Sequence, residues 1–231
     1  MTVLHIITRL ILGGAQLNTV NSCAAQVAAV HDVHLAFGPI YGPERSLLDE
    51  AKASRGTLHE VRSMRRALSP WHDLCCLREL RQLIRRVQPH IVHTHSSKAG
   101  ILGRAAAWSQ RQRSRDALPR VVHTIHGLPF HERQSAVVRS LYVAAERWAA
   151  RRCDRLIGIT QAMCDAFADL RIGQVEQRSV IPSGIDIARF SVDHLPRGDA
   201  KAALGIPPEA PTVGIVAHGR PPKGHDELPA S

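Results

Sequence analysis

Short runs of aliphatic and β-branched residues alternate with longer segments of mixed polarity over the first 180 residues of the chain. In chain order, the short runs read TVLHII, VHLAF, TLHEV, HIVHTH, RVVHTI, DRLIGI and RSVIPS. The segments between them carry apolar residues at helical spacing, and examples are 15–30, 70–87, 99–111 and 135–151. Strands that are apolar almost throughout and that alternate with helices are typical of a parallel sheet. The pattern therefore predicts an α/β fold, a Rossmann-like parallel sheet with helices on both faces.

The segment 70–87 shows the helical period well. Four apolar residues fall on one side of it and three arginines form a stripe beside them: Leu77, Leu80, Ile84 and Val87, and then Arg78, Arg81 and Arg85. Such a stripe could lie against anionic lipid headgroups. An ordinary surface helix rich in arginine has the same pattern, so both interpretations stay open.

The amino-acid composition of the chain changes after residue 183. Residues 184–211 are rich in Pro, Gly and Asp, contain one short helical piece from Asp199, and are typical of a linker. A new apolar run at 212–217 then leads into a basic Gly/Pro turn. We expect a first domain at 1–183, a linker at 184–211, and at 212–231 the start of a second domain. A typical domain would need about 150 residues more, so we expect the chain to be truncated.

Composition narrows the class of partner. The chain has 30 basic and 20 acidic residues, a net charge of +10, and 44% apolar residues, which allow a sizeable core. The basic balance favours phosphate-bearing substrates or an anionic bilayer surface. Aromatic residues make up only 4% of the chain, which argues against a stacking platform for single-stranded nucleic acid, and we expect no nucleic-acid partner.

Cysteine usage and the N-terminal run bear on the compartment. The five cysteines form no CxxC pair and are odd in number, which is typical of reduced thiols. The run MTVLHIITRLIL contains His5 and Arg9 and lacks a small-residue cleavage site, so we expect a first strand and no signal peptide. We therefore predict a cytoplasmic protein. A peripheral contact with the inner face of the membrane is compatible with this prediction.

Two glycines follow the first predicted strand. Gly13 and Gly14 allow a ligand to approach the backbone closely, and the helix that begins behind them offers free N–H groups and the positive end of a dipole. A glycine pair without the full GxGxxG pattern is weak evidence, because a plain tight turn explains it equally well.

Polar residues also gather where the fourth predicted strand ends. His93 and His95 alternate along that strand, and Ser96, Ser97 and Lys98 open the next helix. Ligands of open α/β sheets bind beyond the carboxyl ends of the strands, so these residues stand where a site is expected. Either serine could instead serve only as the helix N-cap. A His-x-His pair could also start a zinc site, which would need a third ligand from a neighbouring strand.

The fifth predicted strand ends in the same way. His126 stands just before Gly127 and can point into the same crevice as the loop after His95. A neutral imidazole there could hydrogen-bond a sugar hydroxyl or transfer a proton. We expect His123 to be a packing residue. His131 and the carboxylate of Glu132 follow, with too little around Glu132 to predict a general base.

Six motifs in this order resemble glycosyltransferase family 4 enzymes of GT-B architecture: ITRLILGGAQLNTV, VHTHSSKAGILGRAAA, VVHTIHGLPFHE, LIGITQAMCDAF, VIPSGIDIARF and VGIVAHGRPPKGHDEL. The resemblance implies two Rossmann-like domains that face each other across a cleft. It makes 1–183 the acceptor-side domain and 212–231 the start of the nucleotide-sugar-binding domain. It further implies that the enzyme transfers a sugar with retention of configuration and uses a nucleotide sugar as co-substrate, without a metal or other cofactor.

The resemblance also implies roles for single residues. Gly13 and Gly14 would approach the donor phosphates, and His126 would be the catalytic histidine at the reacting sugar. The acceptor region would contain His95, Ser97 and Lys98.

In the second domain, the family clamps the donor diphosphate with an Arg and, five residues later, a Lys. The lysine matches Lys223, but the arginine position is occupied by His218, which is a poorer partner for phosphate. Pro229 interrupts the helix expected next, and the paired glutamates of the family's nucleotide pocket are absent.

These features lead to one expected function and two alternatives. We expect a glycosyltransferase that acts on a cell-envelope or lipid-linked acceptor, with little activity from this chain unless a separate C-terminal half supplies the donor domain. The first alternative is a non-catalytic or vestigial domain that binds an acceptor or an anionic membrane. The second is a metal-dependent hydrolase that uses His93, His95 and His126.

Overall fold

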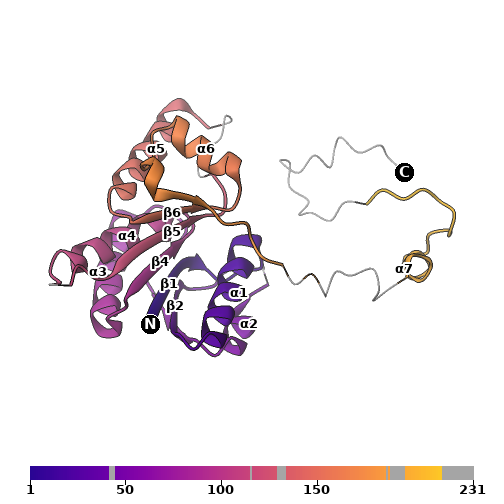
Figure 1. Ribbon diagram of the computed structural model, residues 1–231, viewed down its shortest axis with the longest axis horizontal. Helices are drawn as coiled ribbons and strands as arrows, with labels where there is room; N and C mark the ends of the chain where they lie inside the picture. The colour runs from indigo at the N-terminus through magenta and orange to yellow at the C-terminus, as the bar shows by residue number, and fades with distance from the viewer. Residues whose placement is uncertain (42–44, 115, 129–133, 186, 188–195, 215–231) are drawn as a thin grey trace. The chain divides into compact units, whose positions relative to one another are not determined.

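The computed structural model of the chain describes residues 1–41, 45–114, 116–128, 134–185, 187 and 196–214. The chain separates into two compact units, Met1–Gly184 and Ile185–Ser231. The first unit contains a seven-stranded parallel sheet with the order β3-β2-β1-β4-β5-β6-β7 (Figure 1). The strands are β1 (Thr2–Arg9), β2 (Asp32–Gly38), β3 (Thr57–Glu60), β4 (Ile91–His95), β5 (Arg120–Ile125), β6 (Arg155–Gly158) and β7 (Arg178–Val180).

Each strand predicted within residues 1–183 is present, and helices connect most of the strands along the chain. The helices of the first unit are α1 (Gly14–Ala28), α2 (Leu48–Ala53), α3 (Pro70–Val87), α4 (Ser97–Arg111), α5 (Ala136–Ala150) and α6 (Gln161–Asp169). A short 3₁₀ helix, Val175–Gln177, precedes β7. The sequence pattern did not predict α2 or α6. These helices have six and nine residues, respectively, which are too few to show a clear helical period.

Two hydrophobic clusters cover the two faces of the sheet. Ile7 of β1 packs in one cluster with residues of α1 and α2, whereas Leu4 and Ile6 pack in the other with residues of α3, α4 and α5. Alternate residues of β1 are thus buried on opposite faces, which is why apolar residues stand at adjacent positions of the strand. The predicted fold class, a Rossmann-like parallel sheet with helices on both faces, is confirmed.

Two glycines bring α4 close to the sheet. A Cβ atom on Gly103 would lie 2.7 Å from Cγ2 of Thr94, and one on Gly100 would lie 2.6 Å from Cε1 of His123. Because real Cβ contacts are longer than this, larger residues would push the helix away from β4 and β5. The GILG segment of the second motif therefore has a packing role.

The predicted face of α3 is confirmed. Leu80 and Ile84 are buried, and Leu77 and Val87 pack against the same cluster. In the arginine stripe, Arg78 and Arg85 are exposed, while Arg81 donates a hydrogen bond to Oγ of Ser109 on α4.

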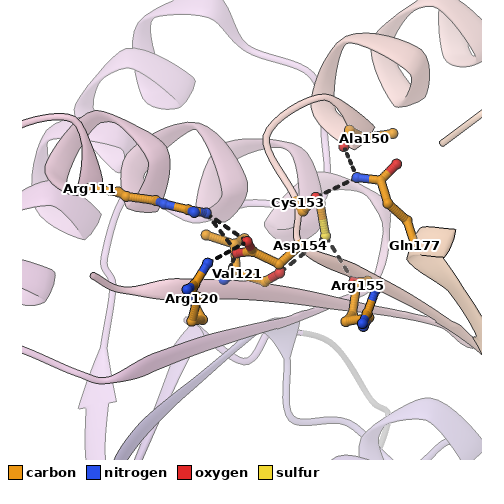
Figure 2. Close-up of polar contacts among 8 residues, drawn as sticks. All are labelled: Arg111, Arg120, Val121, Ala150, Cys153, Asp154, Arg155 and Gln177. Carbon is orange, nitrogen blue, oxygen red and sulfur yellow. Dashed lines mark hydrogen bonds and ion pairs between the residues drawn. The ribbon is translucent and has the colours of Figure 1, made fainter. Parts of the chain in front are cut away.

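Asp154 joins several elements where β5 and β6 begin (Figure 2). Nη1 of Arg111 lies 2.8 Å from both of its carboxylate oxygens, and the backbone N–H of Val121 donates to Oδ2 at 2.7 Å. Arg120 adds a longer ion pair of 3.4 Å. Partial burial alone would raise the pKa of Asp154, but the Val121 N–H and the Arg111 guanidinium outweigh it and lower the pKa below its usual value.

The second unit contains one described helix, α7 (Arg197–Ala203), which begins two residues before the expected helical piece. Nζ of Lys201 donates to the carbonyl oxygens of Pro208 and Ala210 and closes the turn after α7. Of the run predicted as a strand, residues 212–214 are described and lie in no regular element, and 215–217 fall outside the described residues. Within the described part of the chain, no helix has the length and hydrophobicity to cross a bilayer.

Candidate active site

The sheet changes its winding direction between β1 and β4. The chain moves from β1 to β2 and β3 on one side, and from β4 to β5, β6 and β7 on the other. Ligands of open α/β sheets bind beyond the carboxyl ends of the strands at such a point. A ligand site is therefore expected beyond the carboxyl ends of β1, β4 and β5.

The glycine pair leaves open space at the start of α1. Gly13 is the N-cap with φ −177° and ψ 158°, an extended conformation that any residue adopts, so a left-handed turn does not require glycine there. A Cβ atom on Gly14 would meet nothing within 4 Å. No protein atom described near Gly14 excludes a side chain, and the space is compatible with a ligand that approaches the helix N-terminus.

Ser96 has an unusual backbone conformation at the end of β4. Its φ of 62° and ψ of 157° fall in a region that is nearly restricted to glycine and costs about 1–3 kcal/mol. Its Oγ lies 2.7 Å from Oγ1 of Thr8 on β1, and the Thr8 hydroxyl accepts a hydrogen bond from the N–H of Ala99. Ser96 is the N-cap by position, as expected for one of the two serines, but Thr8 supplies the side-chain bond to the first turn of α4.

The two residues after Ser96 are both partly buried but have different surroundings. Ser97 lines a small cavity at the end of β5. Lys98 is held by α3, because its Nζ lies 2.5 Å from Oδ1 of Asp73 and donates to the carbonyl oxygen of Ala67. The side chain of Lys98 is only 12% exposed, so its charge is already neutralised within the domain.

His126 follows β5 and lines the same cavity, which has a volume of about 30 Å³. Gly127 and Glu146 also line it. The carboxylate of Glu146 lies 2.6 Å from Nη2 of Arg104, and both side chains are almost fully buried. The cavity therefore combines an imidazole, a hydroxyl and a carboxylate that is held by a buried guanidinium.

Three more histidines lie beside His126 on the α1 face of the sheet. His5 of β1 pairs in register with His93 of β4, and Nδ1 of His5 lies 3.0 Å from Nε2 of His95. Nδ1 of His95 lies 2.9 Å from Nε2 of His126, while Nε2 of His93 lies 2.7 Å from Oγ1 of Thr124. His123 points to the opposite face, where its Nδ1 lies 2.9 Å from the Thr94 hydroxyl, in agreement with the packing role expected for it.

The buried histidines are neutral at physiological pH. Burial lowers the pKa of His5 to about 4, although its hydrogen bond to Gln26 raises it somewhat. Burial likewise lowers the pKa of His126 to about 4. Burial and the neighbouring histidines hold the pKa of His93 and of His95 well below the ordinary value.

Three of these histidines also satisfy a geometric minimum for a metal site. One ligand nitrogen from each of His5, His93 and His95 lies within 4.8 Å of the others. The third ligand predicted from the sequence was His126, and the structure brings His5 to His93 and His95 instead. Nitrogen ligands of tetrahedral zinc are separated by about 3.4 Å, whereas His5 and His95 already hydrogen-bond each other at 3.0 Å. The arrangement therefore fits a hydrogen-bonded cluster better than a metal centre.

Sequence reasoning missed His5, Gln26, Thr8 and Glu146. His5 carried a weak signal, since a histidine within an apolar strand needs a buried partner. Glu146 gave no such signal, because it stands in a helix that also contains two arginines, Arg139 and Arg147. His131, Glu132, His218 and Lys223 lie outside the described residues.

Comparison with known proteins identifies the family. The sequence model of Glycosyltransferase Family 4 matches residues 12–189, which is more than three quarters of the chain. The chain belongs to glycosyltransferase family 4. The match spans the glycine pair, the clustered histidines His93, His95 and His126, and the cavity that His126 lines, so the resemblance seen in the motifs is confirmed.

Two curated relatives of this family 4 chain are glycosyltransferases. An Escherichia coli enzyme, UDP-Gal:alpha-D-GlcNAc-diphosphoundecaprenol alpha-1,3-galactosyltransferase, is 35% identical over 62% of the chain. D-inositol 3-phosphate glycosyltransferase of Actinosynnema mirum is 28% identical over 60% of the chain. The matched regions cover 35% and 32% of these proteins, so the chain spans only about a third of the relatives it matches.

Solved structures agree on the fold. Anabaena HepE, crystallised in complex with UDP, superposes with a TM-score of 0.66 at 17% identity. The superposition covers 89% of this chain and 50% of HepE. The family 4 chain therefore has the α/β fold found in one half of such structures.

Proposed function

We propose that the chain carries the acceptor-side domain of a retaining, nucleotide-sugar-dependent glycosyltransferase that acts on a lipid-linked or cell-envelope acceptor. One observation carries the proposal. His126, which is neutral at physiological pH, lines the cavity with Ser97 and Glu146 at the carboxyl end of β5, beside the point where the sheet changes its winding direction. A neutral imidazole can accept a hydrogen bond from a sugar hydroxyl without adding charge to the site.

The glycine pair supports the donor side of the proposal. The open space at Gly14 and the first N–H groups of α1 suit the diphosphate of a nucleotide sugar, because a helix N-terminus favours anions. Gly13 adds its backbone as the N-cap of the same helix. The family pattern also implies donor binding by His218 and Lys223, which lie outside the described residues.

The acceptor side of the proposal uses Ser97 and His95. Ser97 lines the cavity, and His95 supports His126 from behind. Lys98 orders the start of α4 through its ion pair with Asp73, and in this proposal it contributes to the acceptor region by position. The E. coli relative is named for a diphosphate-linked lipid acceptor, which supports an acceptor of that chemical class for this chain.

Helix α5 offers a surface for the membrane that such an acceptor requires. Val137 is 71% exposed and Leu141 is 65% exposed, and they lie one turn apart on the same side of α5. Exposed apolar residues on one side of a helix are suited to insertion at a bilayer surface. Sedimentation with anionic liposomes should fall only partly with salt if the apolar pair inserts, and almost completely if charge alone drives binding.

Transfer in this proposal requires a nucleotide-sugar-binding domain opposite the first unit, because the donor must be oriented and shielded from water. A separately expressed C-terminal domain of a family 4 enzyme can supply it. We expect no measurable transfer from a radiolabelled nucleotide sugar to a lipid diphosphate acceptor by the chain alone, and measurable transfer by the pair. Turnover by the chain alone would show that the requirement is wrong, and an unchanged anomeric configuration in the product would support retention.

His126 provides the sharpest variant for this assay. His126→Gln should lower turnover by the pair at least about 100-fold if the imidazole acts in the transition state. His31→Gln, at the loop before β2, is the matched control and should keep normal turnover. Equal rates for both variants would exclude a catalytic role for His126.

A metal-dependent hydrolase is the second, less supported candidate: one nitrogen from each of His5, His93 and His95 lies within 4.8 Å of the others, but the hydrogen bond between His5 and His95 favours a cluster without metal. Titration with zinc or manganese followed by elemental analysis tests it. Stoichiometric metal that is lost in His93→Gln would support this candidate.

A further inference from the structure

Four side chains from three elements and one loop form a continuous chain of hydrogen bonds on the α1 face of the sheet. Oε1 of Gln26 on α1 lies 2.8 Å from Nε2 of His5 on β1. The other ring nitrogen of His5 lies 3.0 Å from Nε2 of His95, and the other ring nitrogen of His95 lies 2.9 Å from Nε2 of His126. Each of the two middle rings therefore uses both of its nitrogens.

A neutral imidazole has one N–H donor and one bare nitrogen acceptor. The amide oxygen of Gln26 can only accept, so Nε2 of His5 carries the proton and its Nδ1 is bare. The bare nitrogen of His5 must accept from Nε2–H of His95, and the bare Nδ1 of His95 must accept from Nε2–H of His126. The orientation of one amide on α1 thus determines the protonation of every ring, and it leaves Nδ1 of His126 as a bare acceptor.

Burial keeps each of these imidazole rings neutral, with a single proton. His5 and His95 are buried, and the pKa of each is lowered mainly by that burial. The pKa of His126 is also lowered by burial, to about 4. A second proton on His5 or His95 would break one of these hydrogen bonds and place a charge at a buried position.

Packing holds the rings in place as well. The ring centroids of His93 and His95 lie 4.3 Å apart, and those of His5 and His95 lie 5.3 Å apart with nearly parallel planes. His93 is itself fixed by the Thr124 hydroxyl. The plane of His95, and through it the plane of His126, therefore has little freedom.

We propose that Gln26, His5 and His95 are positioning residues that fix the tautomer of His126, so that its bare Nδ1 accepts a hydrogen bond from a hydroxyl group of the bound sugar. This inference rests on the proposed function of His126. Gln26, His5 and His95 do not touch the substrate in this inference. His126 accepts the hydrogen bond through Nδ1, while its proton stays on Nε2 and is donated to His95.

Substitutions at position 26 test the donor–acceptor direction of the hydrogen bonds that run from Gln26 to His126. Gln26→Glu keeps an acceptor toward His5, Gln26→Lys offers only a donor, and Gln26→Met offers neither. Asn21→Met, at an exposed position on the same helix, is the control for changes to α1. Thermal melts of the four variants establish that each one folds.

The readout is the pair of ring ¹⁵N signals of His126 in the ligand-free full chain at pH 7.5, assigned by their loss in His126→Gln. Protonated and bare ring nitrogens have well-separated ¹⁵N shifts, so the tautomer is read directly. We expect the Nε2–H form in the parent chain, Gln26→Glu and Asn21→Met, a mixture in Gln26→Met, and the Nδ1–H form in Gln26→Lys. The same tautomer in Gln26→Met and Gln26→Lys as in the parent would overturn the proposal.

The role in sugar binding is measured separately with N-acetyl-α-D-glucosamine 1-phosphate as the probe. Gln26→Lys should weaken binding about tenfold while Gln26→Glu and Asn21→Met leave it near the parent value, because Nδ1–H no longer accepts from the sugar hydroxyl, which must turn its proton toward another partner. A reversed tautomer with unchanged affinity would overturn the role of Nδ1 as the sugar's acceptor. If the parent chain does not bind the probe, the proposed acceptor function fails, and the tautomer result still decides whether Gln26 sets the protonation of His126.

Discussion

The hydroxyl groups of Thr8 and Ser96 lie 2.7 Å apart, and their contact joins the carboxyl ends of β1 and β4. Residues 88 positions apart in the chain thereby hold the two strands together at the point where the sheet changes its winding direction. The Thr8 hydroxyl also accepts from the N–H of Ala99 in the first turn of α4. One side chain thus supports both the unusual backbone of Ser96 and the helix that follows it.

Thr8→Val tests this support. The substitution keeps the shape of the side chain and removes the hydroxyl, so we expect the free energy of unfolding to fall by about 1–2 kcal/mol. Thr19→Val is the matched control, because the Thr19 hydroxyl bonds only the carbonyl of Ala15 within α1 among its described contacts. Urea unfolding measures both, and equal losses in the two variants would show that the contact with Ser96 adds nothing.

Gly103→Ala tests the close approach of α4 to the sheet. The new Cβ would lie 2.7 Å from Cγ2 of Thr94 and 3.2 Å from Cδ1 of Ile6. We expect a loss of about 1–3 kcal/mol in the free energy of unfolding, since the helix has to shift.

Gly14→Ala is the matched control for Gly103→Ala, because the new Cβ would have nothing within 4 Å. Stability should be unchanged or slightly higher, since alanine favours the helix. In the proposed function, the same variant should weaken binding of a nucleotide sugar by the assembled pair of domains. A stable variant with normal donor binding would exclude close approach of the donor at Gly14.

The stability of the first unit should fall as the pH falls below neutrality. The pKa of His5 is about 4 in the folded chain and near 6.5 in the unfolded chain, so the unfolded state binds more protons between these values. The stabilisation is complete above about pH 6.5 and is lost progressively toward pH 4, by on the order of 3 kcal/mol for His5 alone. Urea midpoints at pH 7.5, 6 and 5 measure the slope, and a constant midpoint across this range would contradict the neutral buried cluster.

Asp154 should stabilise the domain without influencing the site, because it lies where β5 and β6 begin and the site lies beyond the ends of β1, β4 and β5 (Figure 2). Asp154→Asn removes the charge that Arg111 contacts at 2.8 Å, and we expect a loss of about 1–3 kcal/mol. Asp49→Asn, at a carboxylate that is 94% exposed, should change stability by less than about 0.5 kcal/mol.

The lowered pKa of Asp154 sets the pH range of its effect. The contribution of Asp154 should be present above its unfolded pKa, near 3.9, and should be lost as the pH falls further. The ¹⁵N shifts of His126 should be the same in Asp154→Asn as in the parent chain. A change in those shifts would show that the two edges of the sheet are coupled.

Much of the fold was predictable because the sequence pattern is local. The seven apolar runs and the helical period of 70–87 depend on neighbours within a few residues, and each became the element that was expected. The position of His126 at the sheet edge near His95 was also predictable, since the last residues of neighbouring parallel strands meet at one edge of the sheet. The short helices α2 and α6 were not predicted, because few residues carry little periodic signal.

The sequence by itself determined which segments become strands and helices, and which polar residues stand at the strand ends. Only the tertiary structure decided the partners of those residues: it placed His5 against His95, directed Lys98 to Asp73, and brought Glu146 into the cavity of His126. The physical reason is that helix and strand periods are short-range properties, whereas these contacts depend on the order of strands in the sheet and on packing between residues far apart in the chain. The sheet order places β1 beside β4 and β4 beside β5, and these two adjacencies, with α1 packed on β1, create the hydrogen-bond chain from Gln26 to His126.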